Sequence, residues 1–311
     1  MTEPILHHYR GSPFSEKVRL MLGCKGLAWR SVTVPVVMPK PDVVALTGGY
    51  RRTPVLQIGA DVWCDTALIA QVLERLQPLP TLFPASAPLA PMLAQWADAT
   101  LFWTVIPYVM QPAGIGHVMG SAPPEAMQAF AADRKPFTAG LVRRTPVDAT
   151  AALQVHLAAL DAQLADGRTW LFGDAVSIAD FSVGHCLWFI RLAGPMASIL
   201  APHAHLSAWL DRLFALGHGR STPMDSGDAV AEAAGASGHA DATVSPGMGF
   251  APGDAVTVAA TDYGRDPVAG LLVGLDLDEV VVRRHDPRAG VVHVHFPRQG
   301  FQIRHDNQEN A

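Results

Sequence analysis

Apolar residues along the first 80 positions alternate between short continuous runs and longer segments with helical spacing. Short runs bounded by turn residues are typical of strands, whereas apolar residues that recur every three or four positions are typical of amphipathic helices. Strand, helix, strand, short helix, strand, strand and helix are therefore expected at residues 4–9, 13–25, 29–34, 42–46, 55–58, 61–63 and 66–76. This order predicts an α/β layer that ends in a hairpin and a helix.

The middle of the chain carries helical patterns without convincing strand alternation. Five prolines between residues 78 and 91 interrupt any helix and indicate a connection between two domains. Helices are expected after them at residues 89–108, 124–142, 150–164, 178–192 and 206–216. These patterns predict an all-α domain over residues 88–219 that follows the α/β domain over residues 1–80.

The last third of the chain changes composition twice. Residues 220–248 are rich in Ala, Gly, Ser and Asp with few large apolar residues, which is typical of a flexible linker, although a short helix at residues 228–234 is possible. Short β-rich runs separated by turn residues follow at residues 255–260, 268–275, 280–283, 291–296 and 301–304. They predict a small five-stranded, SH3-like barrel over residues 249–306, which is matched to no family.

Composition narrows the class of protein. The chain has 311 residues, 49% hydrophobic and 16% charged, which is typical of a globular protein with large cores. A net charge of −5 provides no basic field for nucleic acid or an anionic membrane. The N-terminal residues resemble no signal or transit peptide, and no apolar run is long enough to span a membrane. The three widely spaced cysteines form no C-x-x-C pair, so we expect a cytoplasmic protein without disulfides.

A candidate anion site lies where the first strand meets the first helix. Ser12 is a suitable helix N-cap, and Pro13 suits the first helical position, where its missing N–H costs nothing. The free amides of this helix N-terminus favour an anion such as a thiolate, a carboxylate or a phosphate.

Three ordered motifs carry a family resemblance. The run Ser-Pro-Phe-Ser-Glu-Lys-Val-Arg at residues 12–19, Arg-Thr-Pro-Val-Leu at 52–56 and Trp-Cys-Asp-Thr-Ala-Leu-Ile at 63–69 resemble the soluble glutathione S-transferases. Trp-Leu-Phe-Gly-Asp at 170–174, followed by Ser177 and Asp180, resembles the signature of their C-terminal domain. The resemblance implies a thioredoxin-like glutathione-binding domain and an all-α domain, and it stops before the C-terminal β region.

The resemblance also implies the glutathione-binding residues. Thr53 and Pro54 match the family's cis-proline strand, in which the backbone of the residue before proline binds the cysteinyl part of glutathione. Asp65 and Thr66 match the acid–hydroxyl pair that binds the γ-glutamyl group. Plain N-capping of the following helix is the alternative role for this pair, and both roles use the same geometry.

Candidates for activating the thiol are Ser12, then Ser15, then Tyr9. A hydroxyl at a helix N-terminus lowers a thiol pKa by stabilising the thiolate. Redox relatives have cysteine where this chain has Ser12 and Ser15, so disulfide chemistry of its own is not expected. Phe102, Trp103, Tyr108 and Met110 are candidates for an apolar co-substrate pocket, with an ordinary place in the core as the alternative.

The sequence thus predicts a homodimeric glutathione transferase that conjugates glutathione to a small hydrophobic electrophile. Glutathione is expected as a substrate, no other cofactor is expected, and the expected role is detoxification. The alternative is an inactive transferase-like protein that binds a partner through the C-terminal β domain. His293 and His295 share one sheet face, which permits a metal site, but no Cys or acidic residue at ligand spacing completes it, so no metal is expected. A chain that ends near Gly235 is expected to fold, to dimerise and to bind glutathione.

Overall fold

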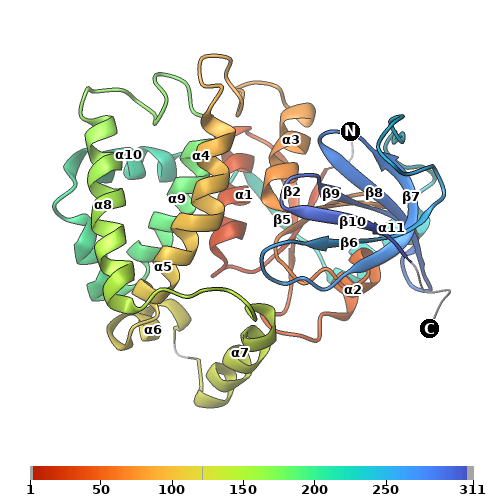
Figure 1. The fold of residues 1–311 in the computed structure, drawn as a ribbon, viewed down its shortest axis with the longest axis horizontal. Helices are drawn as coiled ribbons and strands as arrows, with labels where there is room; N and C mark the ends of the chain where they lie inside the picture. The colour runs from red at the N-terminus through yellow and green to blue at the C-terminus, as the bar shows by residue number, and fades with distance from the viewer. Residues whose placement is uncertain (1–2, 121, 307–311) are drawn as a thin grey trace.

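The computed structural model describes residues 3–120 and 122–306 (Figure 1). The N-terminal part contains β1 (Ile5–His8), α1 (Pro13–Cys24), β2 (Ala28–Thr33), α2 (Pro41–Thr47), β3 (Val55–Ile58), β4 (Asp61–Cys64) and α3 (Thr66–Leu76). This is the predicted order of elements, and each expected element is present within a few residues. Strand β1 pairs in parallel with β2 and antiparallel with β3, which in turn forms the predicted hairpin with β4. The Thr53–Pro54 bond is cis, as the resemblance implies.

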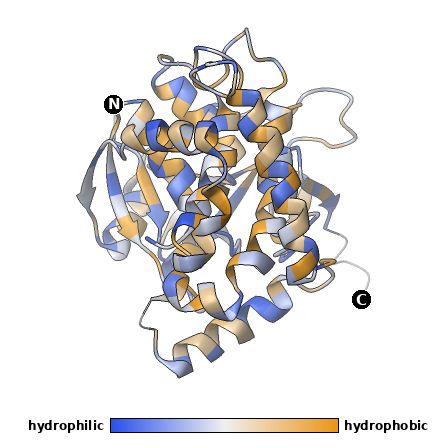
Figure 2. Ribbon diagram, turned by 90° about the vertical axis from the view of Figure 1, so that its left-hand side faces the viewer, coloured by the Kyte–Doolittle hydropathy of each residue, from blue (hydrophilic) through white to orange (hydrophobic). Residues whose placement is uncertain are grey.

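The helical domain packs beside the α/β layer (Figure 1). It contains α4 (Ala90–Trp96), a π-helical segment η1 (Ala97–Leu101), α5 (Phe102–Val109), α6 (Pro112–Met119), α7 (Pro124–Phe137), α8 (Pro146–Leu164), α9 (Ile178–Arg191), a 3₁₀ segment η2 (Gly194–Leu200) and α10 (Ala204–Ala215). The central helix α9 begins at Ser177 with a capping box to Asp180, as predicted. Figure 2 shows apolar and polar residues interleaved along these helices, whose buried faces form one core with α1 and α3.

The segment at residues 220–248 is not the flexible linker that its composition suggests. It contains β5 (Arg220–Pro223), which pairs in parallel with β2, and α11 (Ser226–Gly235), which buries Ala229, Val230 and Ala233. The small size of these residues lowers the apparent hydrophobicity of the segment, but it also lets α11 pack closely against the sheet and against α2. The expectation of a linker was therefore wrong for residues 220–235.

The five predicted C-terminal strands are present as β6 (Ala255–Ala260), β7 (Val268–Leu275), β8 (Glu279–Asp286), β9 (Gly290–Pro297) and β10 (Phe301–His305). They form antiparallel pairs, and β9 also pairs in parallel with β4, so one sheet runs in the order β10-β6-β7-β8-β9-β4-β3-β1-β2-β5. Within residues 3–120 and 122–306, no pair joins β9 to β10. The barrel is thus not confirmed, because the unpaired edge of β4 provides β9 with a partner outside its own region.

A second core joins the two β regions. It contains Val55 and Val62 from the N-terminal strands, Val230 from α11, and Val294 and Phe296 from β9, all at least 97% buried. This core lies on the face of the sheet that α2 and α11 cover, whereas the larger core lies with α1 and α3. The division into separate domains at residues 1–80, 88–219 and 249–306 stays a prediction.

Candidate functional site

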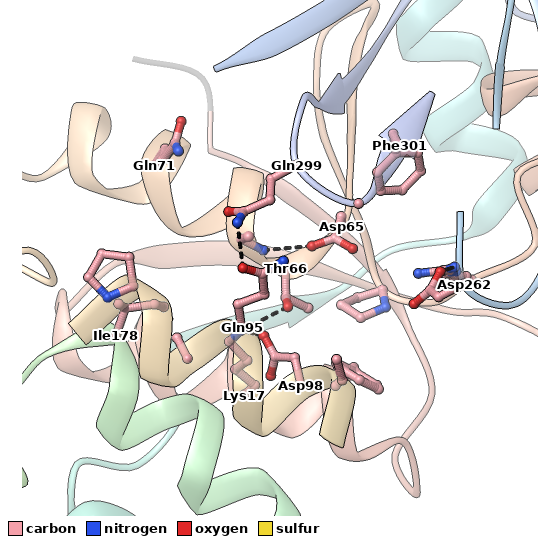
Figure 3. Close-up of a pocket in the computed structure, with 18 of the residues that line it drawn as sticks. Lys17, Asp65, Thr66, Gln71, Gln95, Asp98, Ile178, Asp262, Gln299 and Phe301 are labelled. Carbon is pink, nitrogen blue, oxygen red and sulfur yellow. Dashed lines mark hydrogen bonds and ion pairs between the residues drawn. The ribbon is translucent and has the colours of Figure 1, made fainter. Parts of the chain in front are cut away.

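A cavity of about 190 Å³ lies where the α/β layer, the helical domain and the C-terminal strands meet. Its walls come from the start of α3, from α4 with η1, and from two turns of the C-terminal region (Figure 3). Three segments distant in the sequence therefore enclose one space, which is the usual setting of a ligand site.

The sheet side of the cavity contains all four residues predicted to bind glutathione: Thr53, Pro54, Asp65 and Thr66. Asp65 is the N-cap of α3, and its Oδ1 accepts a hydrogen bond of 2.9 Å from the Ala67 amide. Among the described non-glycine residues it is alone in having a positive φ, 72°, a conformation that costs roughly 1–3 kcal/mol and concentrates at functional sites. Burial raises the pKa of this carboxyl, so a cationic ligand group would relieve an unfavourable charge.

The floor of the cavity is a buried charge network that the sequence did not reveal. The Lys17 ammonium, fully buried, donates to Thr66 Oγ1 at 2.9 Å and to Asp98 Oδ2 at 2.6 Å (Figure 3). Nε2 of His185 lies 2.9 Å from the other oxygen of Asp98. Burial raises the pKa of Asp98, but Lys17 and His185 together lower it below its usual value. Asp98 lies in the π-helical segment η1, a rare irregularity often found at functional sites.

The C-terminal region forms the outer wall. Arg52 bonds to Asp262 and to the Tyr263 carbonyl, and its guanidinium lies 3.9 Å from the centre of the Tyr263 ring. Gln299, in the turn before β10, donates to Gln95 of α4 (Figure 3). These contacts connect the wall to the α/β layer and to the helical domain. The C-terminal residues involved lie in turns, and the sequence pattern does not indicate that these turns contact a site.

The predicted thiol-activating hydroxyls lie outside this cavity lining. Ser12 caps α1 as predicted, since its Oγ accepts from the Ser15 amide at 3.2 Å, and the residue is 3% exposed. Ser15 is fully buried, and its Oγ has no hydrogen-bond partner among the described residues. Tyr9 is half-buried, with the Lys40 ammonium 5.9 Å from its ring centre.

The predicted co-substrate residues lie in or beside the helical core and do not line the cavity. Phe102 packs against Phe14 at 4.7 Å between ring centres, and the Tyr108 hydroxyl donates to the Met196 carbonyl at 2.7 Å. Trp103 has its ring centre 4.9 Å from that of Tyr263. Met110 packs against the same core. Among the described residues, Trp103 is thus the one of these four whose ring pairs with an aromatic residue of the C-terminal wall.

Lys40 is a further charged group that sequence reasoning missed. It is 3% exposed, and its ammonium donates to Thr53 Oγ1 at 3.1 Å. Burial first, and then the charge of Arg134, lower the pKa of Lys40 to about 8. A lone lysine before a proline gives no pattern from which this position could be recognised.

Two family models match the chain over most of its length. The glutathione S-transferase N-terminal domain matches residues 6–81, and the glutathione S-transferase C-terminal domain matches residues 89–212. The chain belongs to the glutathione S-transferase family. A search of curated proteins gives no match. The transferase fold predicted from the three motifs is thereby confirmed.

Solved structures separate this transferase-like chain from smaller members of the fold. A GST-like protein from Pseudomonas syringae is 41% identical, with a TM-score of 0.81, over 98% of this chain and 100% of that one. A glutathione S-transferase from Rhodospirillum rubrum F11 is 22% identical, with a TM-score of 0.51, over 68% of this chain and 87% of that one. Glutathione S-transferase I bound with lactoylglutathione is 16% identical, with a TM-score of 0.52, over 69% and 100%. The C-terminal sheet is thus shared with the Pseudomonas protein, whereas the other two matches cover about two thirds of this chain.

No helix within residues 3–120 and 122–306 of this transferase family member has the length and apolarity that crossing a bilayer requires.

Proposed function

We propose that the chain binds glutathione in the cavity and conjugates it to a small electrophile. The observation that carries this proposal is the convergence of Thr53, Asp65 and Thr66 on one cavity, together with membership in the transferase family. A helix N-terminus receives the carboxylate of a γ-glutamyl group, and the Asp65 carboxylate attracts its ammonium. The cis-proline strand offers the Thr53 backbone to the cysteinyl unit.

The chemistry requires a thiolate. A cysteinyl thiol has a pKa near 8.5 in water, so it is mostly protonated at neutral pH. The N-terminal amides of α1 and a hydroxyl hydrogen bond stabilise the thiolate. The thiolate sulfur then donates an electron pair to an electrophilic carbon. A carbon–sulfur bond forms, and a leaving group departs with the electrons or an activated alkene or epoxide accepts them.

The C-terminal wall limits the size of the cavity. The cavity volume of about 190 Å³ lies below the ~300 Å³ at which typical ligand pockets begin. A tripeptide with a co-substrate therefore either extends beyond the mouth of the cavity or needs the turns around Tyr263 and Gln299 to move outward. The hydrogen bonds of Arg52 and Gln95 to these turns are the contacts that opening would break.

Calorimetric titration with glutathione, paired with a thiol-conjugation assay on a general electrophile, tests the proposal. We expect saturable binding with one site per chain and conjugation faster than the uncatalysed reaction. Absence of binding would contradict the whole proposal, whereas binding without turnover would leave only a glutathione-binding protein.

A separate observation favours the second candidate function, in which the transferase-like protein binds a partner without catalysis. Ser12 and Ser15 are buried, and neither is among the residues that line the cavity, which favours binding without catalysis. Binding without turnover would favour this function.

We expect Ser12→Ala to lower the conjugation rate about 10- to 100-fold with little change in glutathione affinity, because the lost hydrogen bond serves the charged thiolate. Loss of the cap alone costs about 1 kcal/mol of stability and no rate at saturating substrate. Steady-state kinetics and thermal unfolding distinguish the two roles. Ser15→Ala is the matched control, and a rate loss confined to that variant would transfer the role to Ser15. Tyr9→Phe is the next variant if neither serine matters.

Asp65→Asn should raise the dissociation constant of glutathione about 10- to 100-fold, since a charged contact contributes about 1.5–3 kcal/mol. Asparagine caps helices as well as aspartate does and tolerates positive φ, so the unfolding midpoint should change little. Asp225→Asn, at the N-cap of α11, is a matched control outside the cavity lining. An unchanged dissociation constant would reject the binding role of Asp65 and leave it a cap.

A homodimer and a role in detoxification remain predictions carried over from the family, and a cytoplasmic location remains a prediction from the N-terminal residues and the cysteine pattern. The outer edge of β4 is already paired with β9, so a dimer would have to form through other surfaces. Light scattering coupled to size exclusion measures the number of chains.

A further inference from the structure

Three side chains of the types that bind metal meet at the junction of the N-terminal and C-terminal strands. Asp61 begins β4, His293 lies opposite it in the parallel β4–β9 register, and His239 comes from the segment between α11 and β6. Their potential ligand atoms all lie within 4.8 Å of one another. The sequence pattern relates His293 to His295 but not to Asp61 or His239, because these two residues are distant in the chain.

The distances within this group fit an ion better than direct hydrogen bonds. Nδ1 of His239 lies 3.8 Å from Asp61 Oδ2, and Nδ1 of His293 lies 3.8 Å from Asp61 Oδ1. A hydrogen bond between nitrogen and oxygen requires about 2.7–3.2 Å. Two ligands of one tetrahedral zinc ion, each about 2.0–2.1 Å from the metal, lie about 3.3 Å apart. The two observed separations exceed this value by about 0.5 Å.

An unpartnered nitrogen supports the same reading independently. Nδ1 of His293 is buried and has no hydrogen-bond partner among the described residues, although it faces a carboxylate. Its ring stacks on that of His239, with 3.7 Å between ring centres and 13° between ring planes, so one of the two rings has to turn before both nitrogens can point at one ion. A buried polar nitrogen without a partner costs about 1–3 kcal/mol, so a bound ion would satisfy it.

The Asp61 carboxylate is held in place by other groups, as metal-binding carboxylates usually are. Its Oδ2 accepts a 2.8 Å hydrogen bond from the Ala240 amide, and its Oδ1 lies 2.9 Å from Nε2 of His295. His295 is itself fixed between Asp61, Glu279 and the face of Trp63. The carboxylate is 5% exposed, whereas the His239 side chain is 24% exposed and gives solvent access to the group.

We propose that Asp61, His239 and His293 bind a divalent transition-metal ion of the zinc type. Two imidazoles and a carboxylate are ligands that zinc prefers, with water in the fourth position. The ion would connect β4, the segment after α11 and β9, and so fix the C-terminal strands to the N-terminal sheet. The site lies at the start of β4, about 13 Å along the chain from Asp65 at the cavity, so it does not depend on the proposed transferase activity.

Titration of the metal-stripped full-length protein with Zn²⁺ tests this site, with Co²⁺ as a spectroscopic probe. We expect one ion per chain, a visible Co²⁺ band typical of tetrahedral coordination, and a higher unfolding midpoint with Zn²⁺ than with EDTA. His239→Gln and His293→Gln should each weaken Zn²⁺ binding at least about tenfold, as loss of one of three ligands implies.

His285→Gln is the matched control, because His285 is an exposed histidine on the neighbouring strand β8. It should bind Zn²⁺ as the unchanged protein does. Circular dichroism checks that each variant folds, and His239→Gln decides the matter if His293→Gln does not fold, since His239 lies outside the strands. The proposal would be overturned if the unchanged protein bound no stoichiometric Zn²⁺. It would also be overturned if both ligand variants bound Zn²⁺ as tightly as the unchanged protein does.

Discussion

Deletion of residues 236–311 is expected to leave a protein that does not fold to a stable native state. The opposite result was expected from sequence, because the Ala- and Gly-rich segment suggested that the C-terminal strands were independent of the rest. The structure places those strands on the open edge of β4 and over a core that includes Val55, Val62 and Val230.

The size of the effect follows from the apolar surface that the deletion exposes. Among retained residues, Tyr50, Val55, Val62 and Val230 are now at least 96% buried in the core that the deleted strands complete. Each large side chain exposed to water loses roughly 1.5–3 kcal/mol. A typical domain is stable by only ~5–15 kcal/mol in total, so the loss is comparable with the whole stability.

Expression, circular dichroism and size exclusion of the truncated chain measure the result. The full-length variant Leu277→Ser, which changes an 83% exposed side chain of the same region, is the control and should behave as the unchanged protein. A soluble truncated chain with native near-ultraviolet dichroism would contradict this prediction and would support residues 249–306 as a separate domain.

Asp98→Asn is expected to cost about 3–5 kcal/mol of unfolding free energy. The substitution leaves the Lys17 ammonium fully buried beside a neutral amide and the Thr66 hydroxyl, without a charged partner. Because Asp98 and Thr66 also line the cavity, glutathione binding should weaken in the same variant.

A double-mutant cycle separates the pair from its surroundings. Lys17→Met with Asp98→Asn should be less destabilised than the sum of the single variants, since the double variant leaves no buried ammonium. Asp211→Asn removes the exposed partner of Arg191 and should change the unfolding midpoint little. Additive effects of Lys17→Met and Asp98→Asn would show that the two groups do not interact.

The lowered pKa of Asp98 adds a pH dependence with a definite sign. An acid whose pKa is lower in the folded state contributes stability above its ordinary value of about 3.9, and loses it as pH falls through the lowered value. The difference in stability between the unchanged protein and Asp98→Asn should therefore shrink below about pH 4. A constant difference down to the lowest accessible pH would indicate that folding does not lower the pKa of Asp98.

Sequence patterns predicted the fold well where local signals were strong. Ser12 with Pro13, and the capping box from Ser177 to Asp180, mark helix starts because the hydrogen bonds involved join residues within one turn. Asp65 and Thr66, which line the cavity, were singled out because they lie in one motif with recognisable neighbours.

The parts that were missed depend on contacts between distant residues. Lys17 and Asp98 are 81 positions apart, and Asp61 and His295 are 234 apart, so no spacing in one sequence relates them. The outer wall around Tyr263 depends on how the C-terminal strands attach to β4. A single sequence predicts those strands but not their partner, because any open strand edge can provide the same backbone hydrogen bonds.

The parallel pairing of β4 with β9 has a consequence for synthesis of the chain. Trp63 lies opposite His295, so the ribosome must add more than 200 residues after β4 before its neighbour exists. At roughly 5–20 residues per second, the edge of β4 and the adjacent apolar face stay uncovered for about 10–50 s. The nascent chain should therefore bind chaperones until its last strands emerge, and ribosome-bound chains arrested before residue 290 should be more sensitive to protease around β4 than released protein.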